Sequence, residues 1–163
     1  NGRVFLYDHW GSTESDNLIN KIRYLVRGCG CQYIILDHIS IIVSGLEGGD
    51  ERRIIDNMMT KLRSLVEEVK CGMIIVSHLR RPSGDKGHEE GQVTSLSQLR
   101  GSASIGQLSD IVIGLERNQQ DSESSDVTTV RVLKNRWSGE TGVATTLTYS
   151  KTTGRMSEDD VPF

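Results

Sequence analysis

Two residues that could do chemistry each end an apolar run of the sequence. Asp37 ends "QYIILD" and His78 ends "MIIVSH". In open α/β sheets, ligands collect outside the carboxyl ends of parallel strands, so these side chains are expected at one sheet edge. An isolated carboxylate there needs a strong partner, and Mg²⁺ is commonly bound by one carboxylate together with nucleotide phosphates. We predict that Asp37 binds Mg²⁺ and that His78 donates a hydrogen bond to a terminal phosphate.

Each of these residues also has a simpler interpretation. Asp37 could cap the loop that follows it, and His78 could bond a neighbouring backbone carbonyl. Asp8 ends a further apolar run, "RVFLYD", and the same argument applies to it. The residues are more informative together than apart, because the ends of adjacent parallel strands converge on one site.

A pair of cations marks a third position. Lys134 and Arg136 are two residues apart in "RVLKNR", which reads as a strand, so both side chains are expected on one face. Adjacent cations repel each other unless an anion lies between them. We predict that the pair points at the phosphates of a neighbouring subunit, with an arginine finger supplied in trans. The alternative is a solvated strand face.

The loop after His78 carries Arg80, Arg81 and Lys86 among several glycines. The chain has a formal net charge of -3, so contact with a polyanion requires a local basic patch of this kind. A mobile cationic loop suits a phosphate backbone. No aromatic residue is present in the loop to stack on bases. The alternative is an ordinary solvated loop, and two adjacent glutamates weaken the electrostatic argument.

Alternating elements in the first half of the chain would position these residues. Apolar spacing predicts a helix ending at Gly28 and a longer one between Asp50 and Gly72. Strands are predicted at 3–8, 32–37 and 73–78. The order strand, helix, strand, helix, strand predicts an α/β domain with a parallel sheet, covered by helices on both faces.

The second half reads differently. A helical stretch at 95–110 and a strand at 111–115 precede two β-branched strands, at 127–136 and 143–150, and a hairpin at 151–156. This end of the sheet is predicted to be antiparallel. The 163 residues are the size of one domain, which we place at 1–156, followed by an acidic tail at 157–163.

Some features are absent from the sequence. No Gly-Lys dipeptide occurs, so the phosphate-binding loop G-x-x-x-x-G-K-S/T is missing. No apolar run is long enough to span a bilayer. The chain opens "NGRVFLYD" without an initiator Met, and we expect that it begins inside a larger polypeptide. An odd number of cysteines without paired spacing favours reduced thiols in a cytosolic protein.

Six blocks of the sequence, in order and spacing, resemble the C-terminal part of the RecA-like motor domain of ring-shaped replicative DNA helicases. The resemblance extends to the helicase half of T-odd phage helicase-primase proteins and, more distantly, to DnaB and Twinkle. It covers nearly the whole chain. The blocks are "YIILDHISIIVSG", "DERRIIDNMMTKL", "SHLRRP", "HEEGQ", "LRGSASIGQLSDIVIGLERNQQ" and "RVLKNRWSGETGVATTLTYSKTTG".

The resemblance implies roles at the nucleotide. Asp37 corresponds to the Walker B aspartate that acts on Mg²⁺, and His78 to the sensor of the γ-phosphate. Arg136 corresponds to the arginine finger that reaches the neighbouring subunit's ATP, with Lys134 beside it. Tyr149 corresponds to an aromatic residue that packs on the adenine base.

It also implies roles at the DNA and between subunits. Arg100 corresponds to a position that links DNA-facing loops to the nucleotide site. Gln107 corresponds to a contact with nucleotide or between subunits, and Arg117 to a further interface position. Arg80 and Lys86, with Arg81 between them, would hold single-stranded DNA in the central channel.

The expected function is therefore part of an ATP-dependent (or other NTP-dependent) hexameric helicase that translocates on single-stranded DNA in the cytoplasm of a bacterial host. A primase domain is possible in the same chain. The Walker A lysine and the upstream catalytic glutamate are missing, so the segment alone is predicted not to hydrolyse ATP. Two alternatives stay open: a RecA-like ATPase that is no helicase, such as a recombinase or clock-type ring, and a catalytically silent DNA-binding fragment.

Overall fold

The structure is a computed structural model that describes residues 2–7, 15–42, 51–82, 84, 86–101 and 103–158. Two compact units are present, one formed by Asn1–His78 with Arg100–Leu108 and the other by Leu79–Leu99 with Ser109–Phe163. The sequence predicted a single domain. That prediction stays a prediction; within the described residues, the parallel and the antiparallel strands belong to separate sheets.

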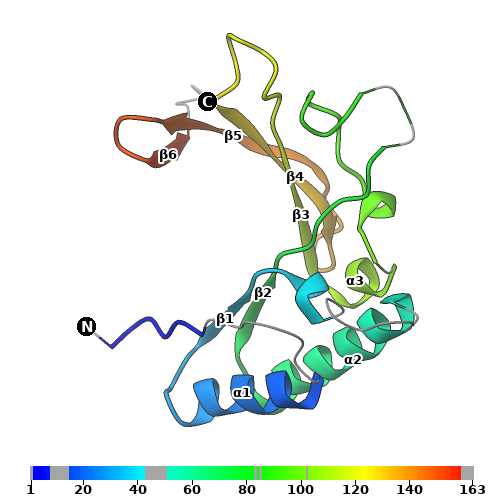
Figure 1. Cartoon of the computed structure of the whole chain (residues 1–163), viewed down its shortest axis with the longest axis vertical. Helices are drawn as coiled ribbons and strands as arrows, with labels where there is room; N and C mark the ends of the chain where they lie inside the picture. The colour runs from blue at the N-terminus through cyan, green and yellow to red at the C-terminus, as the bar shows by residue number, and fades with distance from the viewer. Residues whose placement is uncertain are drawn as a thin grey trace. The chain divides into compact units, whose positions relative to one another are not determined.

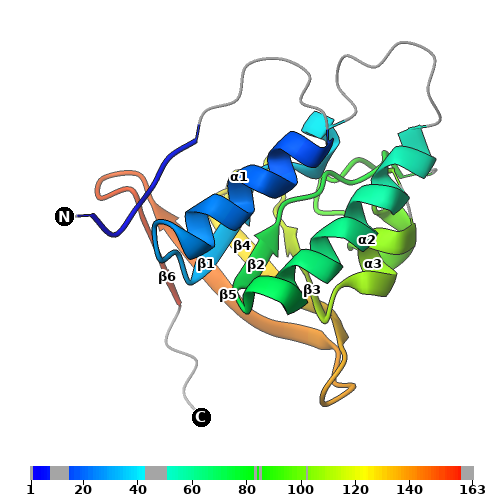
Figure 2. The ribbon, with the colours of Figure 1, turned by 90° about the horizontal axis from the view of Figure 1, so that it is seen from below.

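The first unit contains the predicted parallel strands. β1 (Tyr33–Leu36) and β2 (Gly72–Ile75) pair in parallel, and their last residues, Leu36 and Ile75, lie opposite each other. Two long helices, α1 (Ser15–Arg27) and α2 (Glu51–Val69), run along one side of this pair (Figures 1 and 2). Two short helices, η1 (Ile39–Ile42) and α3 (Ala103–Leu108), complete the unit.

The core of the first unit follows the apolar stripe of α2. Ile55, Met58 and Leu62 recur at helical spacing and are fully buried, with Ile22 of α1 and Ile39 of η1 also in the core. The stripe was predicted from its spacing, and its burial confirms it. Each buried side chain of this size contributes about 1.5–3 kcal/mol to folding.

The opposite face of the β1–β2 pair is open within the described residues. Tyr33, Ile35 and Ile74 are all more than half exposed, whereas Ile34 on the other face is buried. The sequence predicted helices on both faces because both faces are apolar. Among the described residues, α1 and α2 run along one face of the pair (Figures 1 and 2).

The described residues at the start of the chain, 2–7, do not form a strand. The run "RVFLYD" was predicted to be a strand, but residues 4–7 belong to neither sheet, and Leu6 is 94% exposed. A strand exists through the hydrogen bonds to its neighbour. Residues 4–7 take no part in either sheet, although the Lys21 Nζ atom lies 4.7 Å from the centroid of the Tyr7 ring.

The second unit is an antiparallel sheet, as predicted. Its strands are β3 (Ile111–Glu116), β4 (Val127–Asn135), β5 (Gly142–Ser150) and β6 (Arg155–Glu158), in the spatial order β3-β4-β5-β6 (Figure 1). A short helix, η2 (Leu96–Gln98), precedes them. The strand β6 continues to Glu158, so the acidic tail predicted to begin at residue 157 starts within a strand. Among the described residues, no helix has the length and apolarity required to cross a membrane.

Candidate functional site

The carboxyl ends of β1 and β2 bring the first two predicted residues to one edge. Asp37 directly follows β1 and is exposed. The chain after it stays close to the end of β2, because the Ile39 amide donates a 3.0 Å hydrogen bond to the Val76 carbonyl. The Asp37–His38 peptide bond is cis. Asp8 lies outside the described residues, as does the glycine-bearing loop at 43–50.

His38, which the sequence argument overlooked, contacts His78. The two imidazole rings meet edge to face, with centroids 4.3 Å apart. His78 is exposed, whereas His38 is half-buried and its Nδ1 atom has no hydrogen-bond partner within the described part of the chain. A signal was available in the sequence, since both apolar runs are followed by a histidine.

Arg100 reaches this edge from a distant part of the chain. Its amide donates a 3.0 Å hydrogen bond to the carbonyl of His78, and its side chain is exposed. The next residue, Gly101, has a φ of +102°, and a Cβ atom there would clash with Cδ1 of Ile55. Only glycine suits that turn against α2. The predicted residues Asp37, His78 and Arg100 therefore lie in one unit, with His78 and Arg100 in direct backbone contact.

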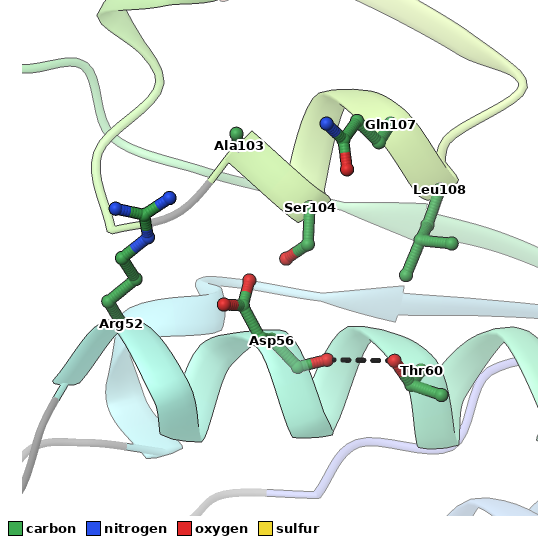
Figure 3. Close-up of a pocket in the computed structure, with 7 residues that line it drawn as sticks. All are labelled: Arg52, Asp56, Thr60, Ala103, Ser104, Gln107 and Leu108. Atoms are coloured by element: carbon green, nitrogen blue, oxygen red, sulfur yellow. Dashed lines mark hydrogen bonds between the residues drawn. The ribbon is translucent and has the colours of Figure 1, made fainter.

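Gln107 lies on α3 and lines a pocket between α2 and α3 (Figure 3). The pocket has a volume of about 310 Å³, and its other polar lining residues include Arg52, Asp56 and Ser104. The α2 residues recur four apart and face α3 in the close-up, where Thr60 Oγ1 donates a 3.0 Å hydrogen bond to the Asp56 carbonyl. Polar residues at this spacing on an amphipathic helix were a usable signal that sequence reasoning passed over.

Lys134 and Arg136 contact two adjacent residues, Ser109 and Asp110. Lys134 lies in β4 and is half-buried, and its Nζ atom donates a 2.8 Å hydrogen bond to the Ser109 carbonyl. The strand ends at Asn135, so Arg136 lies in the following turn. That both side chains point at the phosphates of a neighbouring subunit stays a prediction.

Arg136 is the more accessible of these two cations. Its side chain is 61% exposed, and Nη1 lies 3.3 Å from Oδ1 of Asp110. Its amide also donates a 2.9 Å hydrogen bond to the Asp110 carbonyl. A backbone anchor with a long, solvent-exposed ion pair leaves the guanidinium able to exchange Asp110 for another anion.

Arg117 and Tyr149 lie elsewhere in the second unit. Arg117 directly follows β3, and its Nε atom donates to the Ser125 carbonyl in the connection to β4. Tyr149 lies on β5 and is 37% exposed. Its amide donates a 2.9 Å hydrogen bond to the carbonyl of Asp126. Both side chains are exposed, as contacts with a ligand or a neighbouring subunit require.

The cations of the loop after His78 are exposed: Arg80, Arg81 and Lys86. Arg80, at the start of this loop, is hydrogen-bonded to other residues of the second unit. The Arg80 amide donates a 2.7 Å hydrogen bond to the Gln98 carbonyl, and Nε2 of His88 lies 3.0 Å from the Arg80 carbonyl. The backbone of Arg80 is therefore held on both its amide and its carbonyl side.

Glu116, at the end of β3, is a buried carboxylate that sequence reasoning missed. It accepts hydrogen bonds from Thr94 and Arg131. Burial acts to raise the pKa of Glu116, but the bonds from Arg131 and Thr94 outweigh it, so that pKa lies below its usual value. The signal was the one that selected Asp37, a single acid at the end of the apolar run "IVIGLE".

The described residues could supply one ligand to a Mg²⁺ ion whose other ligands are phosphate and water oxygens. No cluster of three or more histidine, cysteine or acidic side chains suitable for a metal occurs among them. Mg²⁺ prefers oxygen ligands and usually takes one or two carboxylates together with phosphates and water. The exposed carboxylate of Asp37 suits that role, whereas the imidazoles of His38 and His78 do not.

Comparison with known proteins gives a family match over nearly the full chain. Residues 2–158 match the profile of the DnaB-like helicase C-terminal domain. A protein of Enterobacteria phage T3 named DNA helicase/primase is 44% identical over 149 residues, which are 91% of this chain and 26% of that protein. The chain thus spans about a quarter of the length of this curated relative.

Solved structures with the same fold include an ATPase domain and a DnaB-like helicase. The ATPase domain superposes with a TM-score of 0.75 at 23% identity, over 94% of this chain and 54% of that one. The DnaB-like replicative helicase, whose structure also describes its interactions with primase, superposes with a TM-score of 0.73 at 24% identity. The match covers 92% of this chain and 36% of that one. A KaiC-like protein from Pyrococcus horikoshii superposes with a TM-score of 0.60 at 18% identity, over 90% of this chain and 57% of that one. These likenesses establish a RecA-like α/β fold.

Proposed function

Because this chain belongs to the DnaB-like helicase C-terminal domain family, we propose that it is part of an ATP-driven replicative helicase that translocates on single-stranded DNA and unwinds duplex. The observation that carries the proposal is the continuity of one segment. Asp37 and His78 lie at the same edge of the sheet, beyond the carboxyl ends of the parallel strands β1 and β2. The chain after His78 forms the loop that bears Arg80 and Lys86. A change at a bound phosphate can therefore pass directly to cations that hold DNA.

Asp37 and His78 would serve the nucleotide. Asp37 would hold Mg²⁺, which neutralises phosphate charge when bound. His78 would donate a hydrogen bond to the terminal phosphate and lose that bond after hydrolysis. Arg100, bonded through its amide to the His78 carbonyl at 3.0 Å, would transmit the resulting shift toward the DNA-facing loops.

Arg136 would act on the nucleotide of a neighbouring subunit. Its exposed guanidinium lies 3.3 Å from the half-buried carboxylate of Asp110, and the phosphates of ATP would replace that partner. Lys134 supports this position indirectly, because its bond to the Ser109 carbonyl fixes the residue before Asp110. Tyr149 packs on the base, and Gln107 and Arg117 contact nucleotide or the adjoining subunit.

The remaining parts of the motor would come from outside these 163 residues. The phosphate-binding loop with its lysine is needed for the main grip on ATP. The segment by itself is therefore expected to show no ATP turnover above a blank without protein. In the natural polypeptide we expect a hexameric ring, a possible primase domain, and action on single-stranded DNA in the cytoplasm of a bacterial host.

A second candidate is a RecA-like ATPase that is not a helicase. The fold likeness to a KaiC-like protein favours it, with a TM-score of 0.60. A strand-displacement assay separates the two, because only a helicase releases the annealed strand of a forked duplex in an ATP-dependent way. The third candidate, a silent DNA-binding fragment, predicts DNA binding without any hydrolysis by the natural polypeptide.

The deciding experiment uses the natural, full-length polypeptide with Asp37→Asn and a matched control, Asp16→Asn. Asp16 pairs with Lys61 at 2.6 Å on an exposed surface of the first unit, so its loss should have little effect. We expect Asp37→Asn to abolish ATP hydrolysis and unwinding, and Asp16→Asn to retain both. Retention of unwinding by Asp37→Asn would contradict the proposal.

A further inference from the structure

The carboxylate of Glu116 is the most heavily bonded acidic group of the second unit's described residues. It is 8% exposed. Its Oε1 atom accepts hydrogen bonds from the Thr94 amide at 2.8 Å, the Thr94 hydroxyl at 2.8 Å and Arg131 Nε at 2.7 Å. Its Oε2 atom accepts from Arg131 Nη2 at 3.1 Å. A buried carboxylate with this many donors holds its partners in a defined geometry.

The partners belong to different parts of the unit. Thr94 lies in the segment 79–99, which begins at the cationic loop, whereas Arg131 lies on β4. The segment also lies directly against β3, because a Cβ atom at Gly114 would clash with Oγ1 of Thr94. Thr94 is thus held against β3 by its hydrogen bonds to Glu116 and by its close contact with Gly114.

A second set of contacts, made by the backbone of Asn118 and Gln119, lies just beyond Arg117. The Gln119 amide donates a 2.8 Å hydrogen bond to the Glu89 carbonyl, and Glu90 forms an isolated antiparallel bridge with Asn118. The two sets of contacts flank Arg117 on its two sides in the sequence. Between them they hold the segment that runs from Glu89 to Thr94.

We propose that Glu116 is a positioning residue that joins the DNA-binding cations of the loop to the strands leading to Arg117 and Arg136. Through Thr94 it holds the loop bearing Arg80 and Lys86, and through Arg131 it holds β4, which Arg136 follows. The loop and the subunit-facing arginines then move as one body. This inference rests on the proposed function, because it assumes that the loop cations hold single-stranded DNA.

The test measures DNA binding by the natural polypeptide carrying Glu116→Gln. Fluorescence anisotropy with a labelled single strand, at several salt concentrations and with a non-hydrolysable ATP analogue, gives both the Kd and its salt slope. We expect DNA binding about 10-fold weaker and a salt slope reduced by about one unit, as for loss of a phosphate contact. Binding of the ATP analogue should weaken as well, but less than DNA binding, because Glu116 reaches Arg136 only through Arg131 and β4.

A double-variant comparison separates positioning from general loss of stability. If Glu116 acts through the loop, Glu116→Gln should add nothing to the DNA-binding defect of Arg80→Ala/Lys86→Ala. Glu68→Gln is the matched control, since Glu68 contacts Arg23 and Arg27 in the first unit. Additive defects, or an equal defect in Glu68→Gln, would overturn the proposal.

Two further measurements cover the remaining outcomes. Should Glu116→Gln fail to fold, Thr94→Val removes only the hydroxyl bond, and it is expected to give a smaller defect of the same kind. Wild-type binding by that variant would count against the inference. Absence of single-strand binding by the wild-type protein would instead contradict the proposed function. In that case, hydrogen exchange still tests the contact between Glu116 and Thr94, because the Thr94 amide should exchange faster in Glu116→Gln.

Discussion

The imidazole rings of His38 and His78 meet edge to face at the carboxyl ends of two parallel strands, with centroids 4.3 Å apart and planes inclined by 62°. His38 directly follows Asp37, so the contact connects the predicted metal ligand to the predicted phosphate sensor. The His38 ring is half-buried and the His78 ring is exposed. The inner ring therefore restricts the orientation of the outer one.

This contact predicts a graded response at His38. An edge-to-face ring pair contributes about 0.5–1.5 kcal/mol, so His38→Ala in the natural polypeptide should lower the kcat of DNA-stimulated ATP hydrolysis by roughly 2- to 10-fold. His38→Phe keeps the ring and should stay within about two-fold of wild type. Steady-state kinetics on both variants decide the matter. Equal losses in the two would show that the imidazole nitrogens, not the ring packing, carry the effect.

Arg136 is expected to act in trans. Arg136→Ala should lower ATP hydrolysis severely, on the scale of about 10³ to 10⁵ known for arginine fingers of GTPases. Mixed rings provide the sharper measurement. Arg136→Ala subunits retain an intact Asp37, and Asp37→Asn subunits retain an intact finger, so mixing the two inactive proteins should restore part of the activity. If no mixture recovers activity, the finger is not supplied by the neighbour.

The pKa of Glu116 predicts a pH dependence of stability. Because that pKa is lower in the folded protein than its usual value of 4.5, the ionised carboxylate stabilises the fold above about pH 4.5. This contribution is lost as the pH falls through the folded-state pKa. The difference in unfolding midpoint between wild type and Glu116→Gln should therefore be largest near pH ~7 and shrink below pH ~4.5. Leu115→Ala, on the same strand, changes no titrating group. Its unfolding midpoint should differ from that of the wild type by an amount that does not depend on pH in this way.

Lys70 is a position where a substitution should stabilise the protein. It follows the last residue of α2 and has a φ of +57°, a left-handed conformation that favours glycine. Lys70→Gly should raise the free energy of unfolding by up to about 1 kcal/mol. Lys70→Ala is the control, because it also loses the 3.6 Å pair with Glu67 but keeps the left-handed strain. Denaturant unfolding of both variants tests this, and a gain in the alanine variant alone would contradict it.

Elements with strong periodicity could be predicted without any knowledge of the fold. The apolar spacing of α2, with Ile55, Met58 and Leu62 on one stripe, specifies a helix and its buried face, because a helix repeats every 3.6 residues whatever lies around it. The apolar run before Asp37 specifies a strand end in the same local way. From two such runs, the proximity of Asp37 and His78 at one sheet edge could be predicted.

Which side chains meet depends instead on how the elements pack. The partner of Glu116 is Thr94, 22 residues earlier, and that of Lys134 is the carbonyl of Ser109, 25 residues earlier. The register shift between Val112 and Ile113 against β4 sets which residues lie opposite β3, and strand β4 ends before Arg136. Periodicity repeats along one element and carries no information on register between elements. The contacts that hold the loop and the arginines are set by that register.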